Sequence, residues 1–367
     1  MMNKFTVLSL LLAVSALGLM AQEKDTTTYK QVQFLKLNQA NDLFTVWNQS
    51  DKYYTDGIDI EVANTIFNNK VANFMLLGFK TPYKDYSLSF RQDMFVPENT
   101  DTTAIDKTDR PYAAQLFFVY AKYSNQFWKG KKIVTKMYMG VQGPWAQGKE
   151  TQQEVHVITD SKDVLGWDNQ IGNGLMLDYE MQYLQLLPLS TPITELHMFA
   201  KARTGTINTD FTVGYRFKFG RYTDSYTNFF GIHNPDYRYN FNEEDLTKMT
   251  KSRSKMIPKH IRQKSKKEQV TYLNNKLNRK FQFYFFTEGD VVYRLRDGSV
   301  EGSLIQFEPS VYTYGYDDYE HFVLGGRYGF VIQYSHAYIE FARYVHTDTY
   351  REDGFFGYGR AILSWVF

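Results

Sequence analysis

The segment from Phe211 to Phe219 alternates its residue types in a regular way. Every odd-numbered residue in it is aromatic or aliphatic, whereas Thr212, Arg216 and Lys218 occupy even positions. A β-strand points successive side chains to opposite faces, so this strand would have one apolar face and one charged face. That division is typical of a strand that separates membrane lipid from a polar lumen. The segment therefore predicts a transmembrane β-barrel.

About twelve segments can be interpreted as strands, and an even number is what bacterial single-chain barrels have. They are Tyr29–Phe44, Tyr53–Phe67, Tyr86–Val96, Pro111–Ser124, Lys132–Val141, Leu175–Leu187, Ile193–Arg203, Phe211–Phe219, Phe281–Arg294, Phe322–Ser335, Ala337–Thr349 and Phe355–Phe367. The last has aromatic residues at alternate positions up to the final Phe367, which resembles the assembly signal of outer-membrane barrels. We therefore expect barrel assembly machinery to act on the chain during biogenesis.

The composition agrees with an all-β, twelve-stranded antiparallel barrel of the bacterial outer membrane. The chain has 29 Tyr and 29 Phe, and aromatic girdles at the two membrane interfaces are a feature of such barrels. Cysteine is absent, so stability has to come from closed secondary structure and not from disulfides. A net charge of +2 and the absence of a recognition motif argue against nucleic-acid binding. The alternative fold is a water-soluble β-sandwich or lipocalin-like barrel.

The first 21 residues have the order of a secretory signal peptide. Asn3 and Lys4 precede an apolar run from Phe5 to Met20, and Ala21-Gln22 offers a small-residue cleavage site. The alternative is a short N-terminal membrane anchor. No later run of about 18 apolar residues follows, which argues against transmembrane helices. We expect residues 22–367 to form the exported barrel domain, located in the outer membrane of a Gram-negative bacterium.

Residues 224–276 do not fit a strand and are strongly basic. Strand alternation places this segment on the periplasmic side, and the simpler interpretation is a mobile, solvated insert. The more specific interpretation is that the insert binds an acidic periplasmic partner through charge attraction. Its cations are Lys248, Lys251, Arg253, Lys255, Lys259, Arg262, Lys264, Lys266 and Lys267.

The long polar segment from Gly143 to Gly174 interrupts the strands and contains His156. Gln152 precedes His156 by four residues, so both would share one face if this segment forms a short helix. Successive strands of the barrel run in opposite directions. This alternation of strand direction places the outer loop at the same rim as Asn41-Asp42, Thr55 and the loop at 97–110. Each has an ordinary explanation, since Asn-Asp favours turns, Thr favours strands and a loop histidine is usually solvated.

An ordered set of short motifs resembles the outer-membrane lipid A 3′-O-deacylase family. The resemblance covers most of the chain after residue 21, apart from the basic insert. The motifs are Asn41-Asp42, Tyr54-Thr55-Asp56-Gly57, Asp109-Arg110-Pro111-Tyr112-Ala113, Gly143-Pro144, Gln152 with His156, and Gly166-Trp167-Asp168-Asn169-Gln170. The family fold is a twelve-stranded barrel, which agrees with the strand count.

The resemblance implies an ester hydrolase that removes acyl chains from lipid A. It implies that His156 is the general base activating water, which suits an imidazole at neutral pH. Asn41 and Asp42 match family residues at a calcium site, and hard oxygen ligands suit Ca²⁺. Thr55 matches a residue needed for activity, as a hydroxyl donor near the oxyanion. Gln152 would touch the same substrate as His156.

The chain departs from the family pattern where the acidic sugar core of lipid A would be recognised. The family has a basic residue in the second outer loop, whereas residues 97–102 here contain no lysine. Lys107 and Arg110 are the nearest cations. Two other functions fit the same residues: a non-catalytic lipopolysaccharide-binding or porin-like barrel, and a calcium-dependent outer-membrane phospholipase.

Overall fold

The computed structural model describes residues 31–41, 53–81, 83–159, 164–229, 231–237, 240–347 and 355–367. The predicted signal peptide at 1–21 and the candidate ligand Asp42 lie outside the described residues. The side chains of Asn41 and Thr55 also lie outside them, although the backbone of both is described.

Twelve strands form a closed antiparallel barrel in which each strand pairs with its neighbours in sequence, as predicted. The pairing of the first strand with the last closes the barrel, from Phe34 opposite Val366 to Asn41 opposite Gly359. The strands are β1 Phe34–Asn41, β2 Tyr53–Ala63, β3 Lys84–Val96, β4 Ala113–Gln126, β5 Lys131–Gln142, β6 Gly174–Leu186, β7 Thr194–Gly205, β8 Asn208–Arg221, β9 Phe281–Asp297, β10 Phe322–Tyr334, β11 Ala337–Thr347 and β12 Phe355–Val366.

The second strand is shorter than predicted because the residue after it starts a helix. β2 ends at Ala63 and does not reach Phe67. The side chain of Asn64 accepts a hydrogen bond from the backbone N–H of Ile66, which caps the 3-10 helix η2 (Thr65–Phe67). Helix α2 (Lys70–Met75) follows, capped in the same way by Asn69.

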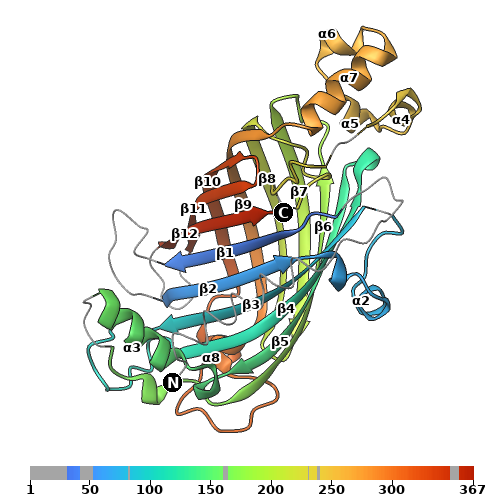
Figure 1. Ribbon diagram of the computed structural model, residues 1–367. Helices are drawn as coiled ribbons and strands as arrows, with labels where there is room; N and C mark the ends of the chain where they lie inside the picture. Colours follow the sequence, from blue (N-terminus) through green and yellow to red (C-terminus); the bar gives the residue numbers. More distant parts are fainter. Residues whose placement is uncertain are drawn as a thin grey trace.

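The two ends of the barrel differ. We call the end where β1 begins the terminal rim and the opposite end the α3 rim, after helix α3 (Gly148–Thr159) (Figure 1). The α3 rim also bears η4 (Pro144–Ala146), η5 (Trp167–Asn169), α8 (Gly298–Glu301) and η6 (Tyr316–Asp318). The terminal rim bears η3 (Phe127–Lys129), α4 (Glu243–Thr247), α5 (Lys251–Ser254), α6 (Lys259–Arg262) and α7 (Lys266–Leu277). None of the described helices is long and apolar enough to cross a membrane.

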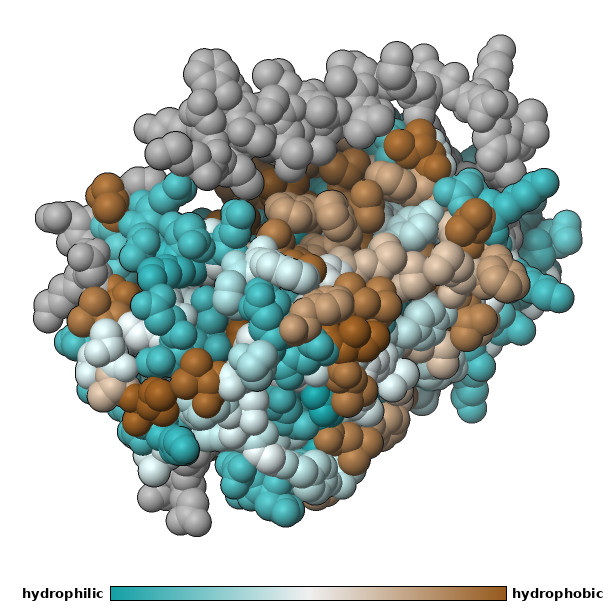
Figure 2. Space-filling model, turned by 90° about the horizontal axis from the view of Figure 1, so that it is seen from below, coloured by the Kyte–Doolittle hydropathy of each residue, from teal (hydrophilic) through white to brown (hydrophobic). Residues whose placement is uncertain are grey.

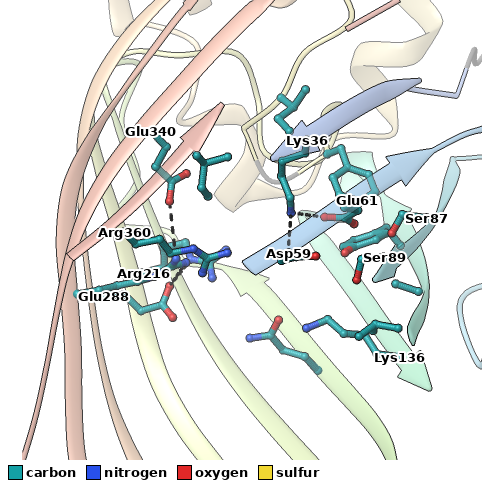
Figure 3. A pocket seen from close by; sticks show the side chains of 18 of the residues that line it. Lys36, Asp59, Glu61, Ser87, Ser89, Lys136, Arg216, Glu288, Glu340 and Arg360 are labelled. Carbon is teal, nitrogen blue, oxygen red and sulfur yellow. Dashed lines mark hydrogen bonds and ion pairs between the residues drawn. The ribbon is translucent and has the colours of Figure 1, made fainter. Parts of the chain in front are cut away.

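The lumen contains interlocking charged side chains around a cavity of about 390 Å³. The carboxylate of Glu288 on β9 accepts hydrogen bonds from Arg216 at 2.5 Å and from Arg327 at 3.1 Å. On the other side of the cavity, Lys36 pairs with Glu61 (Figure 3). These pairs neutralise charges that would otherwise be buried without partners.

The outer wall is apolar, as the alternation predicts. Phe211, Val213, Tyr215 and Phe219 on β8 are exposed, whereas Lys218 between them is buried. Figure 2 shows hydrophobic side chains gathered in a broad band across one face, with hydrophilic side chains on either side of it. This distribution suits a wall that contacts membrane lipid.

The described residues of the segment at 222–237, which joins β8 to the insert helices, enter the terminal end of the lumen. Lys132 on β5 donates hydrogen bonds to the carbonyl oxygens of Ser225 and Asn228, at 2.6 and 3.2 Å. Phe229 and Ile232 line the lumen cavity. The side chain of Gln333 on β10 accepts a hydrogen bond of 3.1 Å from the backbone N–H of His233, so side chains from opposite parts of the wall hold this segment inside the barrel.

The basic insert folds into helices α4–α7 beyond the terminal rim (Figure 1). Leu273 and Leu277 of α7 are buried, and the Lys276 ammonium donates a hydrogen bond to the carbonyl oxygen of Pro192. Burial lowers the pKa of Lys276 to about 8. The periplasmic position, the mobility and the acidic partner of the insert stay predictions.

The lumen ion cluster predicts a stability effect. Replacing Glu288 by Gln leaves Arg216 and Arg327, both partly buried in the lumen, without their shared carboxylate, which should destabilise the barrel by up to about 3–5 kcal/mol. The measurement is the temperature at which the folded, faster-migrating band disappears in semi-native electrophoresis. Glu320→Gln, at an exposed glutamate on the α3 rim, is the matched control and should leave that temperature unchanged. An unchanged temperature for Glu288→Gln would contradict this role.

Candidate functional site

Helix α3 packs on the outside of the barrel, against β3 and β4. Met94 and Val96 of β3 are buried in a cluster with Ala146 and Trp167 from the α3 rim. Asp93 and Phe95, which alternate with Met94 and Val96 along β3, line the mouth of the lumen. Successive side chains of a strand point to opposite faces, so Met94 and Val96 face outward. The space under α3 is therefore on the wall of the barrel and not in its lumen.

Two local features let the helix approach the wall closely. A Cβ atom on Gly148, the first residue of α3, would lie 2.5 Å from the Cβ of Ala114 and 2.8 Å from the indole of Trp167. Only glycine fits there without a shift of the helix. The amide of Gln92 on β3 also donates hydrogen bonds to the carbonyl oxygen of Ala146 at 2.7 Å and to the hydroxyl of Thr151 at 3.1 Å.

Gln152 and His156 lie on the buried face of α3, as their spacing predicts. Their exposed fractions are 3% and 7%, whereas Gln153 and Val157 beside them are exposed. The indole N–H of Trp167 donates a hydrogen bond of 2.6 Å to the side-chain oxygen of Gln152. This bond fixes the amide orientation and leaves the Nε2 donor of Gln152 with no hydrogen-bond partner among the described residues.

Trp167 is itself held in place by the loop that precedes β4. Its ring lies 5.1 Å from that of Tyr112, centroid to centroid, and the Tyr112 hydroxyl donates a hydrogen bond to the carbonyl oxygen of Leu165. Burial raises the pKa of Tyr112, so its hydroxyl keeps the proton that it donates. Two motifs that carried the family resemblance thus contact each other and support Gln152.

Strand pairing brings the backbone of Asn41 and Thr55 to the same rim. Asn41 is paired with Asp56 on β2, and Asp56 is paired with Met94 under α3. The register of β2 against β3 shifts between Tyr54 and Asp56, which makes Thr55 the extra residue of a bulge. Bulges of this kind often re-aim a side chain next to an active site.

The predicted calcium site concerns side chains outside the described residues. Within the described residues, no group of three or more His, Asp or Glu side chains could hold a metal ion. Asn41 at the end of β1 is followed directly by Asp42, and their amide and carboxylate oxygens have the hard character that calcium prefers. The donor chemistry of these two residues suits calcium, and the calcium site stays a prediction.

Residues 97–102 lack the basic residue that the family has in this loop. The nearest cations, Lys107 and Arg110, do not lie under α3. Arg110 is buried, donates a hydrogen bond of 3.0 Å to the hydroxyl of Ser299, and stacks on Phe95. It lines the mouth of the lumen together with Asp93. Lys107 is exposed in the loop before β4.

Sequence patterns did not assign a role to Gln92 or Trp167. Gln92 stands between Phe90 and Met94 on the apolar face of its strand, and this polar break in the pattern was a usable signal. Trp167 belongs to a motif that marks the family, but its bond to Gln152 depends on folding of the loop at 143–174.

Comparisons with known proteins agree with this architecture. A family model described as outer membrane protein LpxR matches residues 5–367. The structure of LpxR from Salmonella typhimurium superposes with a TM-score of 0.62 at 16% identity, covering 91% of this chain and 100% of that one, and shows the same fold. The likeness to a bacterial polysaccharide outer membrane secretin is much weaker, with a TM-score of 0.32 and 6% identity over 92% of this chain and 99% of that one.

A comparison with curated protein sequences found no match. The family match nevertheless spans nearly the whole chain, and the described residues of the motifs that predicted it lie at the α3 rim. This chain belongs to the LpxR family of outer membrane proteins, which confirms the predicted family and outer-membrane localisation.

Proposed function

We propose that the protein is an outer-membrane hydrolase that removes ester-linked acyl chains from lipid A, with His156 as the general base. The observation that carries this proposal is the pair formed by His156 and Gln152 on the buried face of α3. Membership of the LpxR family and the likeness to LpxR from Salmonella typhimurium support this substrate.

The proposed reaction needs no protein nucleophile. His156 accepts a proton from a water molecule as its oxygen attacks the ester carbonyl. The free Nε2 donor of Gln152 and the hydroxyl of Thr55 stabilise the negative charge on the carbonyl oxygen. The tetrahedral intermediate then collapses to a free fatty acid, and the proton held by His156 passes to the leaving alkoxide.

Asn41 and Asp42 would hold a calcium ion beside this pair. When bound, calcium would polarise the ester carbonyl as a Lewis acid. The strand pairing supports this proposal, since the Asn41 backbone pairs with Asp56 and Asp56 pairs with Met94 under α3.

The position of the pair on the outer wall favours a lipid hydrolase over a porin-like barrel. An acyl chain can reach the wall under α3 from the membrane without entering water. The lumen is occupied by ion pairs and, near the terminal rim, by the segment at 222–237. That interior suits a closed structural core better than a wide aqueous channel.

Loss of the base should abolish deacylation. We expect lipid A from cells expressing the wild-type protein to lose acyl mass, and the His156→Ala variant to reduce that conversion by about 10²–10⁴-fold, because a general base contributes that much. Mass spectrometry of extracted lipid A measures it. His260→Ala, at an exposed histidine on α6, is the matched control and should behave as wild type.

Two outcomes of that experiment decide against lipid A deacylation. Unchanged lipid A mass with the wild-type barrel correctly inserted and calcium present would refute the activity. Release of fatty acid from phospholipid, with lipid A intact, would assign the phospholipase function instead.

Removal of calcium should stop the reaction reversibly. We expect purified protein treated with EGTA to lose activity and to regain it with Ca²⁺ more readily than with Mg²⁺, because a site with carboxylate and amide oxygens suits the larger ion. The Asp42→Asn variant should need a higher calcium concentration for half-maximal rate. Full activity in EGTA would exclude the calcium requirement.

A further inference from the structure

Arg343 lies in the same hydrogen-bonded row of the barrel wall as the candidate site. On β11 it pairs with Gly359 of β12, and Gly359 pairs in turn with Asn41 of β1. Directly opposed residues share one face of a sheet, and neighbouring strands are about 4.8 Å apart, which places the Cα atoms of Arg343 and Asn41 about 10 Å apart along the wall. Gly359 between them has no side chain that could separate the two positions.

Alternation along β11 places Arg343 on the outer wall. Tyr338 and Glu340 line the lumen cavity, as does Tyr344, the residue that follows Arg343. Phe341, two residues before Arg343, is 42% exposed on the opposite face. A cation on the lipid-facing wall is unfavourable, and more so towards the membrane midplane than near its edges. Its presence there calls for an anionic partner.

The described part of the protein does not supply that partner. Arg343 makes no hydrogen bond or ion pair with any described residue, in contrast to the lumen arginines Arg216 and Arg327. A guanidinium binds phosphate through two parallel N–H donors, which makes a lipid phosphate a suitable partner in this position.

An apolar hollow of about 700 Å³ on the outer wall adjoins Arg343. Arg343 and Gly359 are among the residues that line it, on the side nearer to Asn41. Its volume lies within the usual range of ligand pockets. A hydrocarbon chain suits its lining, which is mostly aromatic and comes from β8–β11: Phe217, Phe219, Phe285, Tyr328, Phe330 and Phe341.

We propose that Arg343 and this hollow form a lipid subsite, in which the guanidinium binds a phosphate of the substrate lipid and the hollow holds one of its acyl chains. The inference rests on the proposed function and assigns the occupant as the same lipid molecule that is cut under α3. Continuity of the row from Arg343 through Gly359 to Asn41 supports a single occupant. Arg110 lies at the lumen mouth and cannot serve the wall in this way.

The test compares Arg343→Gln with wild type on lipid A that carries its phosphates and on the same lipid after phosphate removal. The variant should raise KM for the phosphorylated lipid about tenfold, since a hydrogen bond to a charged group contributes about that much. Its kcat, and its KM for the dephosphorylated lipid, should match wild type. Arg343→Lys should restore part of the preference, and Arg221→Gln, at an exposed arginine near the terminal rim, should change nothing.

A binding measurement separates failure of this subsite from failure of the proposed function. In the His156→Ala background, native mass spectrometry should show about tenfold weaker retention of phosphorylated lipid A when Arg343→Gln is added. Equal retention, or an unchanged phosphate preference in turnover, would overturn the subsite even if wild type cleaves lipid A. If wild type cleaves no lipid A but binds it through Arg343, the subsite stands and the proposed function fails.

Discussion

Backbone groups that face lipid have to find hydrogen-bond partners within the protein, because the membrane interior offers no water. The pairing of β1 with β12 meets this demand by closing the sheet, so that no strand edge is left open along the barrel. This pairing places Asn41 opposite Gly359, and the pairing of β1 with β2 places it opposite Asp56. The candidate site and the proposed lipid subsite both depend on that register.

The lumen and the outer wall of the barrel carry different kinds of side chain. Charged residues that stabilise one another occupy the lumen, where Glu288 joins two arginines and Lys132 holds the segment at 222–237. The wall carries the apolar residues, and α3 covers part of it over β3 and β4. A substrate dissolved in the membrane meets the wall first, which explains why a lipid hydrolase would place its base there.

The alternating pattern predicted the number and order of strands correctly, because the two-residue period is a local property of the sequence. Local caps were harder to predict: Asn64 ends β2 four residues early through a single side-chain bond. The spacing of Gln152 and His156 predicted their shared helix face. The packing of that face on the outer wall, the bond from Trp167 to Gln152 and the alignment of Arg343 with Asn41 require the pairing of distant segments, which no local pattern contains.

We propose that ester cleavage takes place between α3 and the outer wall. A crystal structure of the His156→Ala protein with uncleaved lipid A would test this location. We expect an acyl ester in the space between α3 and β3, with its carbonyl oxygen within hydrogen-bond distance of the Nε2 atom of Gln152. A lipid bound in the lumen, or an ester on the wall away from α3, would contradict it.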